Sequence, residues 1–344
     1  MIIDSIKISS YKIFFKKKYR NSKFCIKERN GWIISISSND IIGYGDACPL
    51  DEFSNESYEQ AGYGLQGFKL AMDGINDIDF EEALQLASAH GEMQPSVQFA
   101  IEIALYDLQS KLKNNSLHEF LNSKSSKIIK VCKYSIDNLT SSSEITLKIK
   151  MTDNNLFDQI DKIDRLIDKY DNKIKLRLDF NESLDLPRAI RFCKMIEGKP
   201  IDYIEQPLPR DKFEDMYELS LHTETPLAAD EMISNIDSLN RALEFECASV
   251  FILKPMLIGG ILSCQKMIDI IKSESKRYNI SSLLESNVGR LAYLNLCSAF
   301  NIEEESGIAT DVFFKNDVCN FPDSKNGIIK IGNKLGIGIN EINI

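Results

Sequence analysis

The first 125 residues show two hydrophobic patterns in turn. Apolar and polar positions alternate first, which predicts antiparallel strands with one buried face. Asn30-Gly31 lies between two of these segments and predicts a tight hairpin. Beyond a glycine-rich turn at Gly43–Gly45, apolar residues recur at helical spacing. The expected elements of this α+β domain are strands at Ile2–Tyr11, Phe24–Arg29 and Trp32–Ser38, then helices at Ser57–Met72, Asp79–Ala89 and Pro95–Lys113.

From Ile128 the pattern changes to short apolar strands that alternate with amphipathic helices. This alternation predicts parallel βαβ units, and the number of strands matches a TIM-type (β/α) barrel. An open doubly wound sheet is the alternative, but no Gly-x-Gly-x-x-Gly opens the first helix. The expected strands are Val131–Ile136, Ile145–Ile149, Ile174–Phe180, Ile201–Ile204, Leu227–Ala229, Ser249–Leu253, Ser281–Leu284 and a weak one at Glu303–Ala309. The expected helices are Asn155–Tyr170, Pro187–Ile196, Phe213–Thr223, Ile236–Glu244, Gly260–Lys276 and Arg290–Phe300.

We therefore predict a capping domain over residues 1–125 and a modified barrel over residues 126–321. The tail, residues 322–344, is expected to return to the capping domain. Its apolar residues predict a final strand pair joined by a turn at Gly332-Asn333.

The composition of the chain disfavours several classes of function and location. The net charge is −10 and no long basic block occurs, which disfavours nucleic acid as a partner. The basic cluster Lys16–Arg20 could contact an anionic ligand, although an exposed charged loop is the commoner reason for such a run. Eight scattered cysteines without a Cys-x-x-Cys pair, no signal-peptide pattern and no run of 18 apolar residues predict a cytoplasmic protein outside the membrane. The sequence leaves a homo-oligomer open.

Charged residues stand at the ends of the expected barrel strands. Asp179, Glu205 and Asp230 are each one βα repeat apart, so neighbouring strands would bring their carboxylates to one point at the barrel mouth. Buried charges at such a place must neutralise one another or hold a metal. Three carboxylates suit Mg²⁺, with Mn²⁺ as a substitute of similar preference. Unrelated surface acids are the alternative, in a chain with 51 acidic residues.

Three lysines end strands in the same way. Lys148 and Lys150 share one face of their strand because they are two residues apart, and Lys254 would reach the mouth from the opposite side. A lysine beside a second ammonium group can act as a base near neutral pH. Together these parts predict the removal of a proton α to a carboxylate held at the metal. The three histidines, His90, His118 and His222, fall away from the strand ends.

The same residues carry a family resemblance. Lys148-x-Lys150, Asp179-Phe180-Asn181, Glu205-Gln206-Pro207, Asp230-Glu231 and Lys254-Pro255 resemble the motifs of the muconate-lactonising-enzyme subgroup of the enolase superfamily. The segments Gly43–Leu50 and Phe53–Ser57 are similar to that group's capping-domain loop. The resemblance implies an Mg²⁺ enzyme with a lysine base and an enediolate intermediate. It also implies that Asn181 and Gln206 support the metal ligands.

Within this subgroup, three details resemble the o-succinylbenzoate synthases, which are dehydratases of menaquinone biosynthesis. They are Arg177 before the first metal ligand, the segment Ser281–Gly289, and the segment Gly307–Thr310 where dipeptide epimerases usually carry an Asp-x-Asp pair. The resemblance implies that Lys150 is the base, that Lys148 supports it and that Lys254 stabilises the anion. Contacts with the substrate, or with the residues that bind it, are then expected from Arg177, Ser282, Glu285, Ser286 and Thr310. The alternatives are an N-acylamino acid racemase or dipeptide epimerase, or a catalytically idle ligand-binding barrel.

Overall fold

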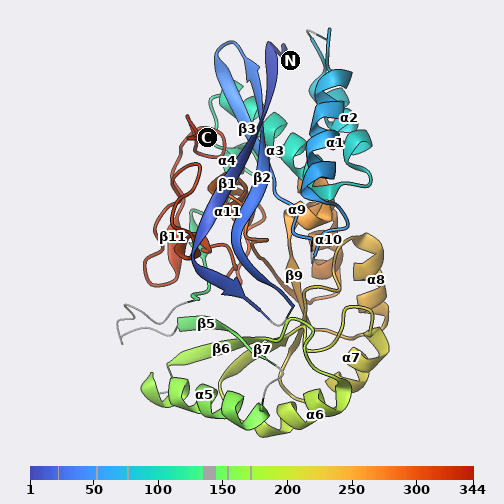
Figure 1. Ribbon diagram of the computed structural model, residues 1–344, viewed down its shortest axis with the longest axis vertical. Helices are drawn as coiled ribbons and strands as arrows, with labels where there is room; N and C mark the ends of the chain where they lie inside the picture. The colour runs from blue at the N-terminus through green and yellow to red at the C-terminus, as the bar shows by residue number, and fades with distance from the viewer. Residues whose placement is uncertain (22, 52, 76, 135–144, 153–154, 171–172) are drawn as a thin grey trace.

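The structure, a computed structural model, describes residues 1–21, 23–51, 53–75, 77–134, 145–152, 155–170 and 173–344. A long antiparallel sheet with helices packed on it lies at one end of the molecule, and a ring of parallel strands surrounded by helices lies at the other (Figure 1). The sheet reaches down to the mouth of the ring. This arrangement is the predicted capping domain and modified barrel.

The capping sheet contains β1 (Ser5–Arg20), β2 (Cys25–Ser38) and β3 (Ile41–Ala47) in that order. The predicted hairpin at Asn30-Gly31 is wrong, because both residues lie inside β2 and Gly31 pairs with Tyr11. A side chain on Gly31 would overlap the Tyr11 ring, so glycine serves here to accommodate an aromatic neighbour on the adjacent strand. The chain reverses instead at Asn39-Asp40, where φ is 47° and 64°, as a two-residue hairpin turn requires.

Gly43 and Gly45 lie in β3 and do not form the expected turn. They face α3 (Pro95–Leu112), whose backbone approaches so closely that a Cβ on either glycine would overlap a helix carbonyl. The other helices of this domain are α1 (Tyr58–Ala71), α2 (Phe80–Gly91) and α4 (Leu117–Leu121). The first three helices agree with the predicted ones to within two residues at each end.

Replacing Gly45 with alanine should force β3 and α3 apart, since the new methyl group would occupy the space of the Ala100 carbonyl. We expect a loss of about 2 kcal/mol or more in the free energy of unfolding, measured by urea denaturation. Gly332→Ala is the matched control, because no atom lies within 4 Å of the position of its Cβ. Equal stability of the two variants would contradict this close approach.

Glu56 precedes α1 in the chain, and its side chain reaches the start of α3. There its Oε1 accepts a hydrogen bond of 2.7 Å from the Ser96 amide. Burial raises the pKa of this carboxyl to about 7. The folded state therefore binds its proton more tightly than the unfolded state. The resulting stabilisation is complete below the ordinary pKa of glutamate and is lost as the pH rises to about 7.

We expect Glu56→Gln to remove this pH dependence, because glutamine keeps an acceptor for Ser96 and does not ionise. Between pH 4.5 and 7.5 the free energy of unfolding of the wild-type chain should fall by up to about 3 kcal/mol relative to that of the variant. Urea unfolding of both proteins at several pH values measures the difference. A constant difference across this range would contradict the burial effect.

The barrel sheet has six parallel strands in the order β10-β9-β8-β7-β6-β5. Single bridges complete the ring: Val131 pairs with Ser306, Lys133 with Leu147, and Ser281 with Gly307. The first and eighth strands of the barrel are thus reduced to these short contacts. The six strands are β5 (Ile145–Lys150), β6 (Ile174–Asp179), β7 (Ile201–Glu205), β8 (Leu227–Ala229), β9 (Val250–Leu253) and β10 (Arg277–Ile280).

Helices connect successive strands on the outside of the ring (Figure 1). Most agree with the predicted helices, but one predicted strand is displaced and another is only partly described. β10 begins and ends four residues before the expected Ser281–Leu284, and residues 135–136 of the first expected strand lie outside the described residues. The barrel helices are α5 (Leu156–Lys169), α6 (Leu186–Met195), α7 (Phe213–Ser220), α8 (Ile236–Glu244), α9 (Pro255–Ile258), α10 (Ile261–Ser273), α11 (Asn287–Ala299) and the 3-10 turn η1 (Asp311–Phe313).

The tail does not form the predicted strand pair with itself. β11 (Ile328–Lys330) instead pairs with β4 (Ile128–Lys130), which precedes the barrel. Beyond it, the Gly336 carbonyl accepts from Leu117 and the Ile337 amide donates to Asp107 of α3. These contacts place the tail against α3 and α4.

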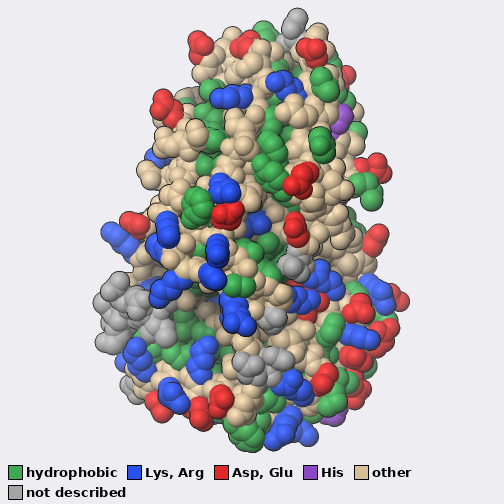
Figure 2. Space-filling model, viewed as in Figure 1, with side chains coloured by type: hydrophobic (Ala, Val, Ile, Leu, Met, Phe, Trp, Pro, Cys, Tyr) green, Lys and Arg blue, Asp and Glu red, His purple; other side chains and the backbone are tan. Residues whose placement is uncertain are grey.

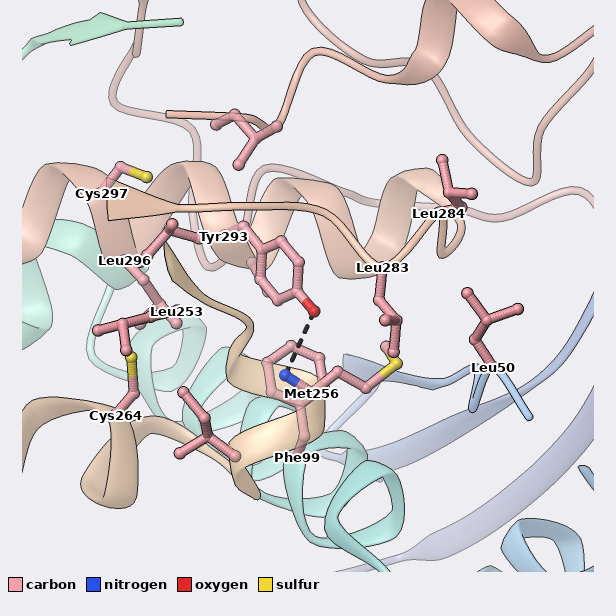
Figure 3. Packing of buried hydrophobic residues seen from close by; sticks show 14 of the residues in the cluster. Leu50, Phe99, Leu253, Met256, Cys264, Leu283, Leu284, Tyr293, Leu296 and Cys297 are labelled. Carbon is pink, nitrogen blue, oxygen red and sulfur yellow. Dashed lines mark hydrogen bonds between the residues drawn. The ribbon is translucent and has the colours of Figure 1, made fainter. Parts of the chain in front are cut away.

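Most buried apolar residues form one continuous core through both parts of the molecule, and a small separate cluster lies on β7, β8 and β9: Tyr203, Ala228, Val250 and Ile252. Figure 3 shows a section of it, where Phe99 of α3, Met256 of α9 and Tyr293 of α11 meet. The Met256 amide donates to the Tyr293 hydroxyl at 3.2 Å. This shared core fixes the position of the capping domain on the barrel. Across the described ranges, every helix is too short or too polar to cross a membrane.

Candidate active site

The three acids predicted as metal ligands converge at the barrel mouth. Asp179 and Glu205 end β6 and β7 and are paired in register, and Asp230 directly follows β8. One carboxylate oxygen from each lies within 4.8 Å of the other two, and all three side chains are buried. Parallel strands explain this meeting, since their carboxyl ends point to the same rim of the ring.

Two lysines reach the same point from β5. Lys148 Nζ lies 2.5 Å from Glu205 Oε1 and 2.9 Å from Asp179 Oδ2. Lys150 Nζ lies 2.6 Å from the same Asp179 oxygen and donates to Asn181 Oδ1 at 2.8 Å. The Lys150 side chain is 32% exposed and that of Lys148 only 8%. Lys150 is therefore the more accessible of these two lysines to a substrate in the mouth.

Lys254 reaches the acids from the other side of the ring. It directly follows β9, its Nζ forms an ion pair with Asp230, and it lies 5.1 Å from the centroid of the Phe53 ring. Its side chain is buried. Lys150 and Lys254 thus stand on opposite sides of the carboxylate cluster, as predicted.

Burial and the neighbouring charges raise the pKa of some groups in the site and lower the pKa of others. Burial disfavours the charge on Lys148 and Lys150, but the negatively charged groups around them, Asp179 first and Glu205 among the others, together outweigh it and raise the pKa of both lysines. Burial lowers the pKa of Lys254, and the ammonium of Lys148 lowers it further. The lysines of β5 hold the pKa of Asp179 well below its ordinary value, despite burial. Among these three lysines, only Lys254 therefore has a pKa below its ordinary value.

The acid cluster has the chemistry of a magnesium site. Three carboxylates supply the hard oxygen ligands that Mg²⁺ prefers, and burial together with Asp179 raises the pKa of Glu205. The Oε2 atom of Glu205 is buried and has no hydrogen-bond partner among the described residues. A buried carboxylate oxygen without a donor is costly unless a cation or water satisfies it. Asp179, Glu205 and Asp230 would hold the ion.

The predicted supporting residues lie next to the acids. The Asn181 amide donates to Asp179 Oδ1 at 3.1 Å, and Gln206 Oε1 accepts from the amides of Asp230 and Met232. Both residues have positive φ, 45° and 38°, an uncommon conformation that clusters at functional sites. Through these contacts they fix where the carboxylates of β6 and β8 lie.

One supporting residue was missed by the sequence interpretation. Glu231 Oε1 accepts from Asn181 Nδ2 at 2.8 Å, so Glu231, Asn181 and Lys150 form a chain of hydrogen bonds. Burial and the charge of Asp179 raise the pKa of Glu231 to about 8. Its position beside Asp230 was the available signal, because a second acid after a buried strand needs a partner of its own.

Arg177 does not lie at the mouth. Its guanidinium donates to Asp202 at 2.7 Å and to Glu305 at 2.9 Å, and it stacks 4.7 Å from the Tyr203 ring. Asp202 lies near the start of β7 and Glu305 just before the eighth strand, so these partners belong to the opposite end of the ring. The geometry gives Arg177 the role of an internal ion pair that ties strands together.

The other predicted contact residues form a linked wall. Ser282 donates to Glu285 Oε1 at 2.8 Å, and the Thr310 hydroxyl donates to Ser282 at 2.9 Å. Ser286 donates to Asp46 of β3. Ser282 and Thr310 line the pocket over the lysines, whereas Glu285 and Ser286 lie behind the wall and hold it.

The capping domain closes the pocket from above with residues that the sequence interpretation did not name individually as site residues, although three of them lie in segments that it noted: Tyr19, Asn21, Phe24, Leu50 and Phe53. On the barrel side, Leu283 and Leu284 complete an apolar surface that faces Lys150 and Lys254. The pocket therefore combines a charged floor with an apolar roof.

The basic cluster Lys16–Arg20 lies in β1 and is not the loop that its charge suggested. It faces Lys162, Arg165 and Lys169 of α5 across a groove of about 1090 Å³ that continues into the pocket through Lys148 and Lys150. Figure 2 shows Lys and Arg side chains gathered across the middle of this face, between the two parts of the molecule. Such a positive groove favours the approach of an anionic substrate, although the net charge of the chain is −10.

Comparison with known proteins places this geometry in a family. Residues 144–341 match the model described as Enolase C-terminal domain-like, and residues 4–108 match that of the MenC N-terminal domain. The o-succinylbenzoate synthase of Bacillus subtilis is 23% identical over 99% of this chain and 94% of its own. The D-Ala-D/L-Ala epimerase of Cytophaga hutchinsonii is 22% identical over 98% and 95%.

Solved structures agree on the fold. The substrate complex of the L-Ala-D/L-Glu epimerase from Bacillus subtilis superposes with a TM-score of 0.88 at 21% identity, over 100% of both chains. The N-succinyl Arg/Lys racemase of Bacillus cereus gives 0.89 at 21% identity, over 100% of this chain and 96% of the other. The enolase-type model alone matches more than half of the residues. The chain belongs to the enolase superfamily.

Proposed function

We propose that the protein is an o-succinylbenzoate synthase of menaquinone biosynthesis, which removes water from a succinyl-hydroxycyclohexadiene carboxylate. The observation that supports it best is the composition of the pocket. Asp230 is the one acid among the described residues that line it, and the apolar side chains that face the lysines, beside uncharged polar ones, include Leu50, Phe53, Leu283 and Leu284. This surface fits an apolar ring better than it fits the charged amine of a dipeptide.

The residues support a two-step elimination. With the charge of Asp179 engaged by Mg²⁺, Lys150 would lose the main partner that raises its pKa, and as a neutral amine it would take the proton α to the substrate carboxylate. Its ammonium form would then give that proton to the departing hydroxyl. The carbon–hydrogen and carbon–oxygen bonds break, a ring double bond forms, and water leaves. Bound Mg²⁺ would supply positive charge that offsets the negative charge developing on the substrate carboxylate. Lys254, under Phe53, adds a second positive charge on the other side.

An epimerase or racemase of acylamino acids is the second candidate, supported by one observation. Lys150 and Lys254 lie on opposite sides of the acid cluster, as two bases that invert one carbon would. The epimerases and racemases among the relatives have nearly the same identity as the synthase. A binding barrel without activity is disfavoured, because such a protein has no need for three lysines converging on three buried acids.

The test is a spectrophotometric dehydration assay with the purified chain, run with Mg²⁺ and with a chelator. A parallel assay in deuterated water follows an N-acylamino acid and a dipeptide by NMR. We expect Mg²⁺-dependent aromatisation that the chelator abolishes. Inversion and deuterium uptake at an α-carbon, without loss of water from the cyclohexadiene, would reject the synthase in favour of the epimerase.

A further inference from the structure

Leu284 occupies an uncommon backbone conformation in the wall of the pocket. Its φ is 64°, which costs a β-carbon-bearing residue roughly 1–3 kcal/mol unless its surroundings enforce it. The neighbouring side chains hold it there: its amide donates to the Ser282 hydroxyl at 3.0 Å, and its carbonyl accepts from Arg29 Nε at 3.3 Å. Arg29 belongs to the capping domain, so the strained residue is held across the domain boundary.

The same guanidinium also holds the opposite wall. Arg29 Nη2 donates to the carbonyls of Cys48 at 2.7 Å and Pro49 at 2.9 Å. These two residues lead directly to Leu50, which lines the pocket facing Leu284. Figure 3 shows Leu50, Leu283 and Leu284 near one another at this edge of the core. One buried side chain therefore sets the separation of two wall segments that are far apart in the sequence.

A second contact fixes the same turn from behind. Asp46 of β3 accepts hydrogen bonds from the Ser286 amide and hydroxyl, at 3.0 and 2.6 Å, and from the Tyr11 hydroxyl at 2.9 Å. Ser286 is the N-cap of α11, where a carboxylate is favoured by the helix dipole. The turn from Ser282 to Ser286 is thus tied to the capping sheet at two points.

We propose that Arg29 is a positioning residue that determines specificity, by clamping Leu284 and the chain leading to Leu50 into a wall that accepts an apolar ring. The proposal rests on the proposed function, since it assigns this wall to the part of the carboxylate substrate that does not react. Arginine suits the task because its fork offers several donors in fixed directions. A lysine ammonium is a point charge that reaches one of the two segments at a time.

The test is a double-mutant cycle between Arg29→Met and Leu284→Ala with the dehydration assay. A wall that contacts only the unreactive part contributes equally to the ground state and the transition state. Arg29→Met should therefore raise KM about tenfold and change kcat less than about threefold. If Arg29 acts through Leu284, it should add less than about twofold to KM in the Leu284→Ala background. Arg29→Lys should lie between Arg29→Met and the wild type.

Additive effects on KM, or a loss of kcat with unchanged KM, would overturn the proposal, because a purely structural residue lowers only the amount of active enzyme. Arg241→Met is the matched control on the outer surface, where Arg241 stacks on Phe213. Hydrogen exchange of residues 281–290 needs no substrate and should be faster in Arg29→Met, while α6 is unchanged. Unchanged exchange would reject the clamp. A wild-type chain that fails to dehydrate the substrate would reject the proposed function and leave the clamp to the exchange result.

Discussion

Lys150→Ala is expected to lower kcat by about 10²- to 10⁴-fold, the range of a lost general acid–base group. Lys150 is the partly exposed lysine of the mouth, and its Nζ is held by Asp179 and Asn181 at 2.6 and 2.8 Å. The proposed mechanism gives this one group both proton transfers. Steady-state kinetics measure the loss, and exchange of the substrate α-proton in deuterated water should disappear with it.

The matched control is Lys199→Ala, which removes a lysine that pairs with Asp164 on the barrel exterior. It should keep kcat within about twofold, as is usual for surface ion pairs. Lys254→Ala then separates the two candidate reactions. In a synthase the α-proton still exchanges through Lys150, whereas in an epimerase exchange is lost for one of the two stereoisomers. Retention of more than a tenth of kcat in Lys150→Ala would contradict its assignment as the base.

The floor of the site could be predicted because its residues follow the repeat of the fold. Asp179, Glu205 and Asp230 recur once per βα unit, and parallel strands bring equivalent positions to one rim. Arg177 shares the inward face of β6 with Asp179, which strand alternation also predicts. Alternation does not say toward which end of the ring a long side chain turns. In the structure the Arg177 side chain turns away from the mouth and forms ion pairs with Asp202 and Glu305.

The roof of the site could not be predicted for a different reason. Leu50 and Phe53 are apolar residues that resemble core residues in sequence, and only the packing of the two domains places them over the lysines. The missed turn at Asn39-Asp40 has the same origin. Asn-Gly has the stronger local preference for a turn, but pairing of Gly31 with Tyr11 in a continuous strand overrode it. Local sequence preferences mispredict a segment when a residue far away in the sequence determines its conformation.

Glu205→Gln should weaken Mg²⁺ binding by more than about 100-fold, since the loss of even a supporting partner typically costs 10- to 100-fold. Glu205 lies between the other two ligands, and glutamine lacks the charge that the ion requires. Titration calorimetry, or electron paramagnetic resonance with Mn²⁺ as the probe, measures binding without any substrate. Glu218→Gln, on the exposed side of α7, is the matched control.

Thermal melting with and without Mg²⁺ distinguishes a loss of metal binding from a loss of folding in Glu205→Gln. Burial and Asp179 raise the pKa of Glu205, so its charge is unfavourable where it lies. Without metal, Glu205→Gln should therefore melt no lower than the wild type. Added Mg²⁺ at about 100 times its dissociation constant should stabilise the wild type by about 2.7 kcal/mol and the variant hardly at all. An equal rise in Tm for both proteins would place the ion elsewhere, and the three acids would then be an ion-pair network for the lysines.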